Sequence, residues 1–320
     1  MKLIYNDIFL EHDTGMHPEN AKRLKSLGPL EPCAIKSAES SLELIHQRAY
    51  IDRVQMICRN GGGHLDRDTI ASARSYQAAV HAVGATLTAA ETEDFALVRP
   101  PGHHAHPDHS SGFCLFNNLA IATQHLLNQG KRVLIFDFDG HLGDGTEKYF
   151  YESDQVLYWS IHQYPAFPGW GSEDEIGSGR GKGYTINVPL PPGSGDDLYF
   201  QALNQMLPAA QQFAPDVVAA SAGFDAHQHD LLLDLRLSAN AFYKTGQILR
   251  EHFKNVFATL EGGYNVEELP RCLYNFLNGI NGKAPYYEEP ATDSAIIVRD
   301  EFEIRLSGLV KNLSDFWTLT

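Results

Sequence analysis

The chain has 320 residues; 43% are hydrophobic, as in ordinary globular proteins, and 20% are charged, which is slightly low. A formal net charge of −15 argues against nucleic-acid binding, because phosphate recognition needs clustered Lys and Arg. No apolar run reaches the roughly 18 residues that span a bilayer, and no signal-peptide core follows Met1, so we expect a cytoplasmic protein with no membrane partner.

Apolar strand-like runs alternate with amphipathic runs along the middle of the chain. We predict strands at residues 95–98, 133–138, 155–161, 184–188, 217–220 and 256–260. We predict helices at residues 117–128, near 147, at 196–213, 238–253 and 300–309. Ser194 with Asp196 and Asp197 would cap the helix at 196–213, and Ser238 the next one. This alternation is typical of βαβ units and of a mainly parallel sheet covered on both faces. With no linker or repeat, residues 1–320 read as a single domain, and residues 285–320 as a capping or contact extension.

The densest group of polar residues follows the apolar run at 133–136. In an extended segment Asp137, Asp139 and His141 lie on one side, because side chains alternate between faces. Two carboxylates and an imidazole at the carboxyl end of a buried strand can hold a divalent metal. The plain alternative is a strand-end turn with solvated aspartates.

Polar clusters follow the other predicted strands as well. They include His103, His104, His162, Asp225 and Tyr264, the last after two glycines. Ligands of open α/β sheets bind at the carboxyl edge, so these residues are expected to converge there. Two carboxylates and a histidine would leave an open metal position, which together with paired histidines and a tyrosine suits metal-assisted hydrolysis of an amide or ester. These considerations do not decide which histidines bind metal and which act as bases.

Five motifs, in this order along the chain, resemble the zinc-dependent histone deacetylase and acetylpolyamine amidohydrolase family, nearest its class II and bacterial members. They are Arg99-Pro100-Pro101-Gly102-His103-His104-Ala105, Gly112-Phe113-Cys114-Leu115-Phe116-Asn117-Asn118, the segment from Asp137 to Gly145, Ser221-Ala222-Gly223-Phe224-Asp225-Ala226-His227 and Leu260-Glu261-Gly262-Gly263-Tyr264. His17-Pro18-Glu19 with Arg23, and Leu65-Asp66-Arg67-Asp68-Thr69, fit the same pattern. The resemblance implies an arginase-like α/β fold with a central eight-stranded parallel sheet.

The resemblance also implies a set of catalytic residues. One Zn²⁺ per chain would be held by Asp139, His141 and Asp225, a ligand set that also admits Fe(II). His104 would act as general base and then acid, oriented by Asp144, and His103 paired with Asp137 would tune the electrostatics beside it. Tyr264 would hydrogen-bond the substrate carbonyl and then the oxyanion.

By the same resemblance, the substrate would enter a narrow tunnel. Gly112, Phe113 and Phe167 would form its walls, Asp68 at the rim would anchor the substrate backbone, and Leu232 would lie where polyamine-selective relatives can carry an acidic residue. Structural K⁺ is expected at two sites. The first would use Asp137, Asp139 and Ser160 with main-chain oxygens of His141 and Ile161, and the second would lie near Phe150, Ser153, Val156 and Tyr184.

Three positions depart from the family pattern. Leu142 replaces a second histidine that is not a zinc ligand, Leu231 replaces a proline, and Leu232 is not acidic. The expected activity is therefore removal of acetyl or other acyl groups from lysine side chains of peptides or proteins. The alternative is an amidohydrolase for acetylpolyamines or other acylated amines on the same site, and a third possibility is a metal-bound scaffold without activity. Additional histidines, His227 and His229 after Asp225 and His106 and His109 in a Pro-Asp loop, are interpreted as solvated or supporting residues.

Overall fold

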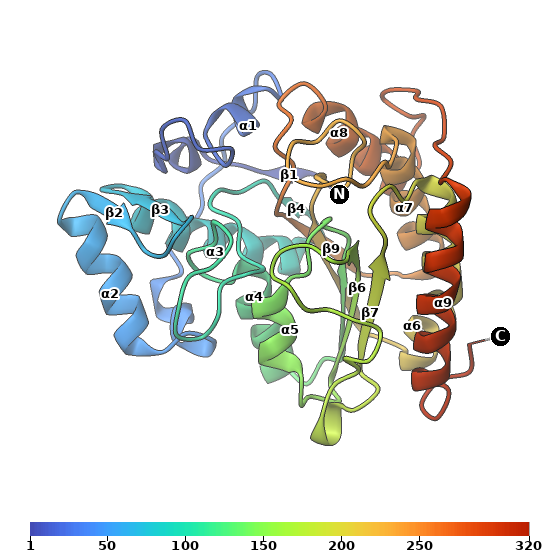
Figure 1. Ribbon diagram of the computed structural model, residues 1–320. Helices are drawn as coiled ribbons and strands as arrows, with labels where there is room; N and C mark the ends of the chain where they lie inside the picture. The colour runs from blue at the N-terminus through green and yellow to red at the C-terminus, as the bar shows by residue number, and fades with distance from the viewer. Residues whose placement is uncertain (320) are drawn as a thin grey trace.

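The structure is a computed structural model that describes residues 1–319. Its centre is a parallel seven-stranded sheet in the order β1-β4-β9-β8-β5-β6-β7 (Figure 1). The strands are β1 Leu3–Ile4, β4 Phe95–Ala96, β5 Val133–Asp137, β6 Val156–Gln163, β7 Thr185–Leu190, β8 Val217–Ala222 and β9 Val256–Leu260. A separate antiparallel hairpin pairs β2 Gly62–His64 with β3 Ile70–Ser72.

Helices cover the sheet on both sides, with α3 and α4 opposite α6, α7 and α8 (Figure 1). Their bounds are α1 Lys22–Lys25, α2 Arg48–Arg59, α3 Ser75–Thr92, α4 Asn118–Asn128, α5 Asp144–Phe150, α6 Asp196–Phe213, α7 Ala239–His252, α8 Leu269–Ile280 and α9 Ile296–Leu313. Short 3₁₀ turns occupy Asp7–Glu11, Glu39–Leu44 and Gly179–Gly181. Among residues 1–319, none of the helices combines the length and apolar character needed to cross a membrane.

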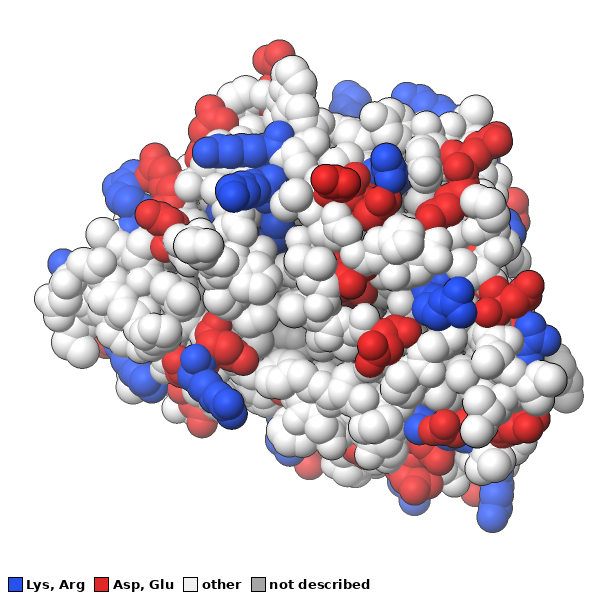
Figure 2. Space-filling model, turned by 45° about the horizontal axis from the view of Figure 1, so that its top comes forward, with Lys and Arg blue, Asp and Glu red and all other residues white. Residues whose placement is uncertain are grey.

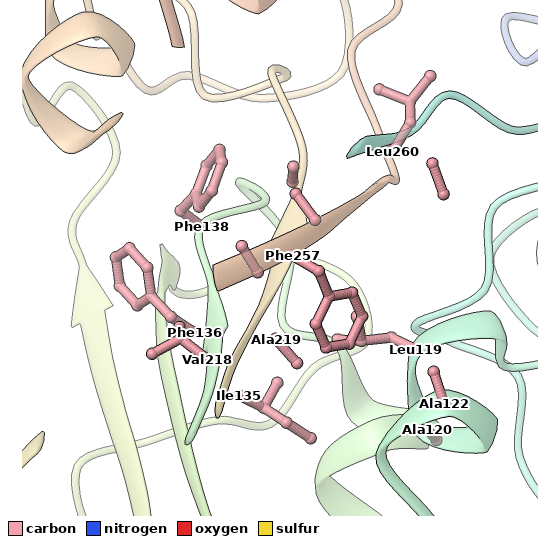
Figure 3. Packing of buried hydrophobic residues seen from close by; sticks show 14 of the residues in the cluster. Leu119, Ala120, Ala122, Ile135, Phe136, Phe138, Val218, Ala219, Phe257 and Leu260 are labelled. Atoms are coloured by element: carbon pink, nitrogen blue, oxygen red, sulfur yellow. The ribbon is translucent and has the colours of Figure 1, made fainter. Parts of the chain in front are cut away.

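The middle strands are buried on both faces, which explains why they read as continuous apolar runs. Along β5 and the residue after it, Phe136 and Phe138 point to one face and Ile135 to the other (Figure 3). Phe257 of β9 lies beside Leu119 of α4, so apolar side chains fill the layer between sheet and helix. This packing leaves the carboxyl ends of the strands free to carry polar loops.

Three features of the predicted fold need correction. The central sheet has seven strands and not eight, because α9 packs along edge strand β7 and the opposite edge ends with the two-residue β1. The strand predicted at 95–98 stops at Ala96, where its partner β1 ends at Ile4. Strand β1 itself was not predicted.

The helix caps also differ from the prediction. Ser238 lies at the N-cap position of α7 as predicted, but its hydroxyl donates to Asp196 at 2.6 Å and makes no capping bond. The N-cap position of α6 is Gly195, and the hydroxyl of Ser194 donates to the carbonyl of Pro191. Helix α9 begins at Ile296, four residues before the predicted start. The bounds of α6, by contrast, agree with the prediction.

Strand order explains where a site can form. The chain passes from β5 outward to β6 and β7, and then returns to place β8 on the other side of β5. Loops leaving β5 and β8 therefore diverge at a topological switch point, where open α/β sheets bind ligands. Residues Asp137 and Ser221 are register partners at this edge.

Candidate active site

Three buried ligand groups meet at the switch point. Asp139 and His141 follow β5, Asp225 follows β8, and one ligand atom from each lies within 4.8 Å of the others. The Nδ1 atom of His141 is 2.8 Å from Asp225 Oδ2 and 3.4 Å from Asp139 Oδ1. This is the one such group of three or more His, Cys, Asp or Glu among residues 1–319.

The charges in this cluster fit a divalent cation. Burial, together with the charge of Asp139, raises the pKa of Asp225 to about 6. Burial alone would lower the pKa of His141, but the carboxylates of Asp225 and Asp139 outweigh it and raise the value to about 10. The two buried carboxylates thus make the site electronegative, and a bound metal ion would take the place of the proton on His141.

The backbone leaves room around the carboxylates. A Cβ at Gly223 would lie 1.9 Å from Asp139 Oδ2, and one at Gly262 would lie 2.4 Å from Asp225 Oδ2. The amide of Gly262 donates to Asp139 at 2.7 Å and that of Gly140 to Asp225 at the same distance, which fixes both carboxylates. Two oxygen donors and one imidazole, fixed in this way, suit Zn²⁺ or Fe(II).

The sequence-based grouping of Asp137 with Asp139 and His141 is only half right. Strand β5 ends at Asp137 and the chain bends over residues 139–141, so side chains no longer alternate as in an extended strand. Asp137 instead contacts His103 Nδ1 at 3.2 Å and accepts from the Tyr158 hydroxyl at 3.2 Å. Asp225, which was expected at the same edge of the sheet and which the resemblance named as a ligand, takes its place in the cluster.

Two histidines lie next to the cluster, and a ring nitrogen of each lies close to a carboxylate oxygen. His104 Nδ1 is 2.6 Å from Asp144 Oδ1, and His103 Nε2 is 3.9 Å from Asp139 Oδ1. Burial and the positive charge of His103 lower the pKa of His104 to about 4. His104 is therefore neutral at pH 7, with Nδ1 engaged and Nε2 left to accept a proton.

Tyr264 is held from two sides. Its amide donates to Asp230 Oδ2 at 2.7 Å, and the guanidinium of Arg23 lies 5.0 Å from its ring centre. Arg23 also donates to the carbonyl of Gly263 at 2.7 Å, so a residue from α1 fixes the loop after β9. The Tyr264 hydroxyl makes no hydrogen bond with residues 1–319, which leaves it available to a substrate.

Aromatic side chains line the approach to the cluster. The ring of Phe167 is 5.0 Å from that of His104, and the ring of Phe113 is 5.6 Å from that of Tyr264. A Cβ at Gly112 would lie 2.3 Å from His104 and 3.0 Å from Phe167, so only glycine fits there. The predicted wall residues thus contact the predicted catalytic ones.

At the outer rim, Asp68 and Leu232 are partly exposed. Asp66 holds the loop that carries Asp68, because its carboxylate accepts from the amides of Asp68 and Thr69 at 3.0 and 2.7 Å. The Thr69 hydroxyl accepts in turn from the amide of Phe113 at 3.1 Å. The loop with Asp68 is therefore tied to the tunnel wall.

The structure adds two residues that sequence reasoning gave no role. Asp230 holds Tyr264, and Glu261 accepts from the amides of Gly102 and His103 at 2.6 and 3.1 Å. Glu261 lies in a motif that carries the family resemblance and Asp230 lies just after another, and this position is the one sequence feature that could have pointed to them. His227 contacts Glu289 at 3.0 Å and is not in the metal cluster, in line with its interpretation as a supporting residue.

The residues expected to hold potassium lie in two places. Asp137 and Ser160 are register partners on β5 and β6, and Ile161 follows Ser160. Phe150 ends α5 and its carbonyl accepts from the amide of Ser153 at 2.9 Å, shortly before β6 begins at Val156. Tyr184 lies beside β6, where its carbonyl accepts from the amide of Tyr158 at 2.9 Å.

Comparison with known proteins agrees with this geometry. The family described as "Histone deacetylase domain" matches residues 17–280. A "Probable deacetylase" of Archaeoglobus fulgidus is 36% identical over 83% of this chain and 81% of its own length. The "Histone deacetylase-like amidohydrolase" of Pseudomonas aeruginosa is 33% identical over 86% of this chain and 79% of its own. The solved HD domain of HDA15 superposes with a TM-score of 0.89 at 30% identity, covering 99% of this chain and 97% of that one.

Fold and site thus define an α/β metallohydrolase with its ligands at a topological switch point. The chain belongs to the histone deacetylase family, whose members are zinc-dependent deacetylases.

Proposed function

We propose that this protein hydrolyses acyl-lysine side chains of peptides or proteins with one zinc ion bound by Asp139, His141 and Asp225. The observation that carries the proposal is the buried three-ligand cluster directly beside the His104–Asp144 pair. When bound, zinc supplies Lewis-acid activation of the amide carbonyl and of the attacking water. The remaining chemistry comes from side chains of this protein.

His104 is the general base and then the general acid. Its Nδ1–H donates to Asp144, which fixes the tautomer and leaves Nε2 to take a proton from the attacking water. The same nitrogen then delivers the proton to the leaving amine. His103 stays protonated between Asp137 and Asp139, because these carboxylates raise its pKa against the effect of burial. It therefore supplies positive charge beside the base.

Tyr264 donates its hydroxyl to the oxyanion that forms from the carbonyl. Arg23 and Asp230 keep the tyrosine in place, so little reorganisation is needed during the reaction. Gly112, Phe113 and Phe167 enclose the aliphatic part of the substrate and exclude water, and Asp68 accepts hydrogen bonds from its backbone amides.

Leu232 favours an acyl-lysine substrate over an acetylpolyamine. Its partly exposed apolar side chain offers no charge to a second ammonium group. We extend the proposal to structural potassium at the two groups of residues described above. We also propose that the chain acts as one catalytic unit in the cytoplasm, which its four cysteines, all free of disulfides, support.

The test is turnover of a fluorogenic acetyl-lysine peptide beside acetylspermidine and acetylputrescine, with zinc-stripped protein and a hydroxamate as controls. Faster zinc-dependent turnover of the peptide is the expected result. Faster turnover of the polyamines would assign the protein to acylated amines instead. No turnover of any substrate by protein with bound zinc would contradict hydrolytic function and favour a scaffold.

A further inference from the structure

The carboxylate of Asp144 is hydrogen-bonded to two histidines. Besides His104 on Oδ1, its Oδ2 atom is 2.9 Å from Nε2 of His106. Burial alone would raise the pKa of Asp144, but the hydrogen bonds from both histidines outweigh it and hold the pKa below its ordinary value. The carboxylate is therefore charged and accepts a hydrogen bond on each oxygen.

The second hydrogen bond has a structural consequence. Asp144 is 2% exposed, and among residues 1–319 His106 is the one side chain that donates to Oδ2. Without it, a buried carboxylate oxygen would lose its partner, and the group could rotate about the Cβ–Cγ bond. Such a rotation would move Oδ1 away from His104, whose ring direction depends on that contact.

His106 is itself well anchored. Its carbonyl accepts from Nδ1 of His46 at 3.0 Å, and its amide donates to the carbonyl of His109, also at 3.0 Å. The rings of His106 and His109 stack with centres 4.3 Å apart and planes 8° apart. The carbonyl of Pro107 accepts from the amide of Gln47 at 2.8 Å, so the loop is tied to the start of α2.

We infer that His106 is a positioning residue for the general base: its Nε2–H on Oδ2 of Asp144 holds the carboxylate in the orientation in which Oδ1 fixes His104. This inference rests on the proposed function, since it concerns the same base. It gives a role to a histidine that sequence analysis treated as solvated or supporting. His106 is not among the residues of the metal cluster, and its side chain is connected to the general base through Asp144.

The test compares His106→Ala, His106→Gln and the control His109→Ala in the full-length, zinc-loaded enzyme. His106→Ala should lower kcat about tenfold and leave KM within about twofold, because the base is misplaced while the tunnel is unchanged. His106→Gln should recover most of the activity, since its amide N–H can donate to Oδ2. His109→Ala removes the stacked ring and its exposed contact with Asp108, but it leaves Nε2 of His106 on Asp144 and the backbone bonds of His106 in place, so its kcat should remain near that of wild type.

A cavity of about 550 Å³ lined in part by His106 offers a further readout. Imidazole added to His106→Ala should restore part of kcat and leave wild type unaffected. Unchanged kcat in His106→Ala would overturn the inference, and so would equal losses in the Ala and Gln variants accompanied by lost zinc or stability.

Failure of the proposed function can be distinguished from failure of this inference. If wild type hydrolyses nothing, the downfield proton resonance of the His104–Asp144 hydrogen bond still reports on geometry. We expect that resonance to shift or broaden in His106→Ala and to be retained in His106→Gln. An unchanged resonance in both would contradict a positioning role whether or not the protein is active.

Discussion

The buried metal-ligand cluster, which we call the floor of the site, and the exposed entrance to the tunnel, the rim, are built in different ways. On the floor, Asp139, His141 and Asp225 are almost completely buried and held by backbone amides and by one another. At the rim, Leu232 is 38% exposed and Asp68 is partly exposed, and both residues lie on loops. On the face shown in Figure 2, acidic and basic side chains lie interspersed among neutral ones. We therefore expect the floor to fix the chemistry and the rim to influence the choice of substrate.

This difference gives different expectations for substitutions. A floor residue is held by several buried partners, so its loss should affect every substrate equally. A rim residue faces solvent, so its loss should change the relative rates of substrates and leave zinc binding unchanged. Four variants, from the largest expected effect to the smallest, examine this contrast.

Asp139→Asn should have the largest effect. It removes a negative ligand from a cluster of three, so we expect zinc content to fall well below one per chain and activity to fall at least about 10³-fold on all substrates. Metal analysis and turnover of peptide and polyamine substrates measure both effects. Full zinc occupancy in this variant would show that the ligand set is misassigned.

Tyr264→Phe should retain zinc and lower kcat by roughly 10²–10³-fold, as expected for loss of an oxyanion donor. The ring contact with Arg23 and the amide bond to Asp230 remain, so folding should not change. Steady-state kinetics with metal analysis separates this variant from Asp139→Asn. A near-normal kcat would remove Tyr264 from the mechanism.

Asp68→Ala should act at the rim. Loss of charged acceptors for the substrate backbone is expected to lower kcat/KM for peptides by about 10–100-fold. Acetylspermidine and acetylputrescine have no peptide backbone, so their kcat/KM should stay close to that of wild type. An equal fall in kcat/KM for peptides and polyamines would show that Asp68 acts like a floor residue. Asp66→Asn is the control, because it disturbs the loop without removing Asp68.

Leu232→Glu should have the smallest effect. A partly exposed carboxylate attracts a second ammonium group by at most about 1 kcal/mol, which is up to roughly fivefold in relative rate. We expect the ratio of acetylspermidine to peptide turnover to rise by that amount at low salt, with zinc content unchanged. The gain should fade at high salt, because exposed charges are screened. Leu232→Gln is the matched neutral control.

Sequence predicted the framework of this protein better than its supporting contacts. Largely apolar runs identified β5, β8 and β9, because strands buried on both faces are apolar over most of their length. The periodicity of 196–213 identified α6. Strand β1 has two residues and no pattern to detect. Asp139, His141 and Asp225, all of which follow strands, were correctly expected to converge. His162 was not placed correctly, because β6 extends to Gln163 and His162 lies inside it, where its Nε2 contacts the carbonyl of Gly171 at 2.9 Å.

What the sequence could not supply was the partner of each polar group. Asp137 and Asp139 have the same chemistry and neighbouring positions, yet only the bend after β5 places one with His103 and the other in the cluster. Asp230 reaches Tyr264 across two loops that are 34 positions apart in the chain. Such pairings depend on tertiary geometry, so the spacing of residues along the chain does not predict them.

The order of strands has a consequence for synthesis on the ribosome. Strand β4 pairs with β9, which lies over 160 positions later in the chain according to the register of Phe95 with Ala258, and β5 must wait for β8. The nascent chain therefore exposes unpaired apolar strand edges until residues 217–260 have emerged, a non-local assembly that slows folding. Chaperone capture of ribosome-stalled chains that end near residue 215, and its loss in chains that end beyond residue 280, would measure how long that exposure lasts.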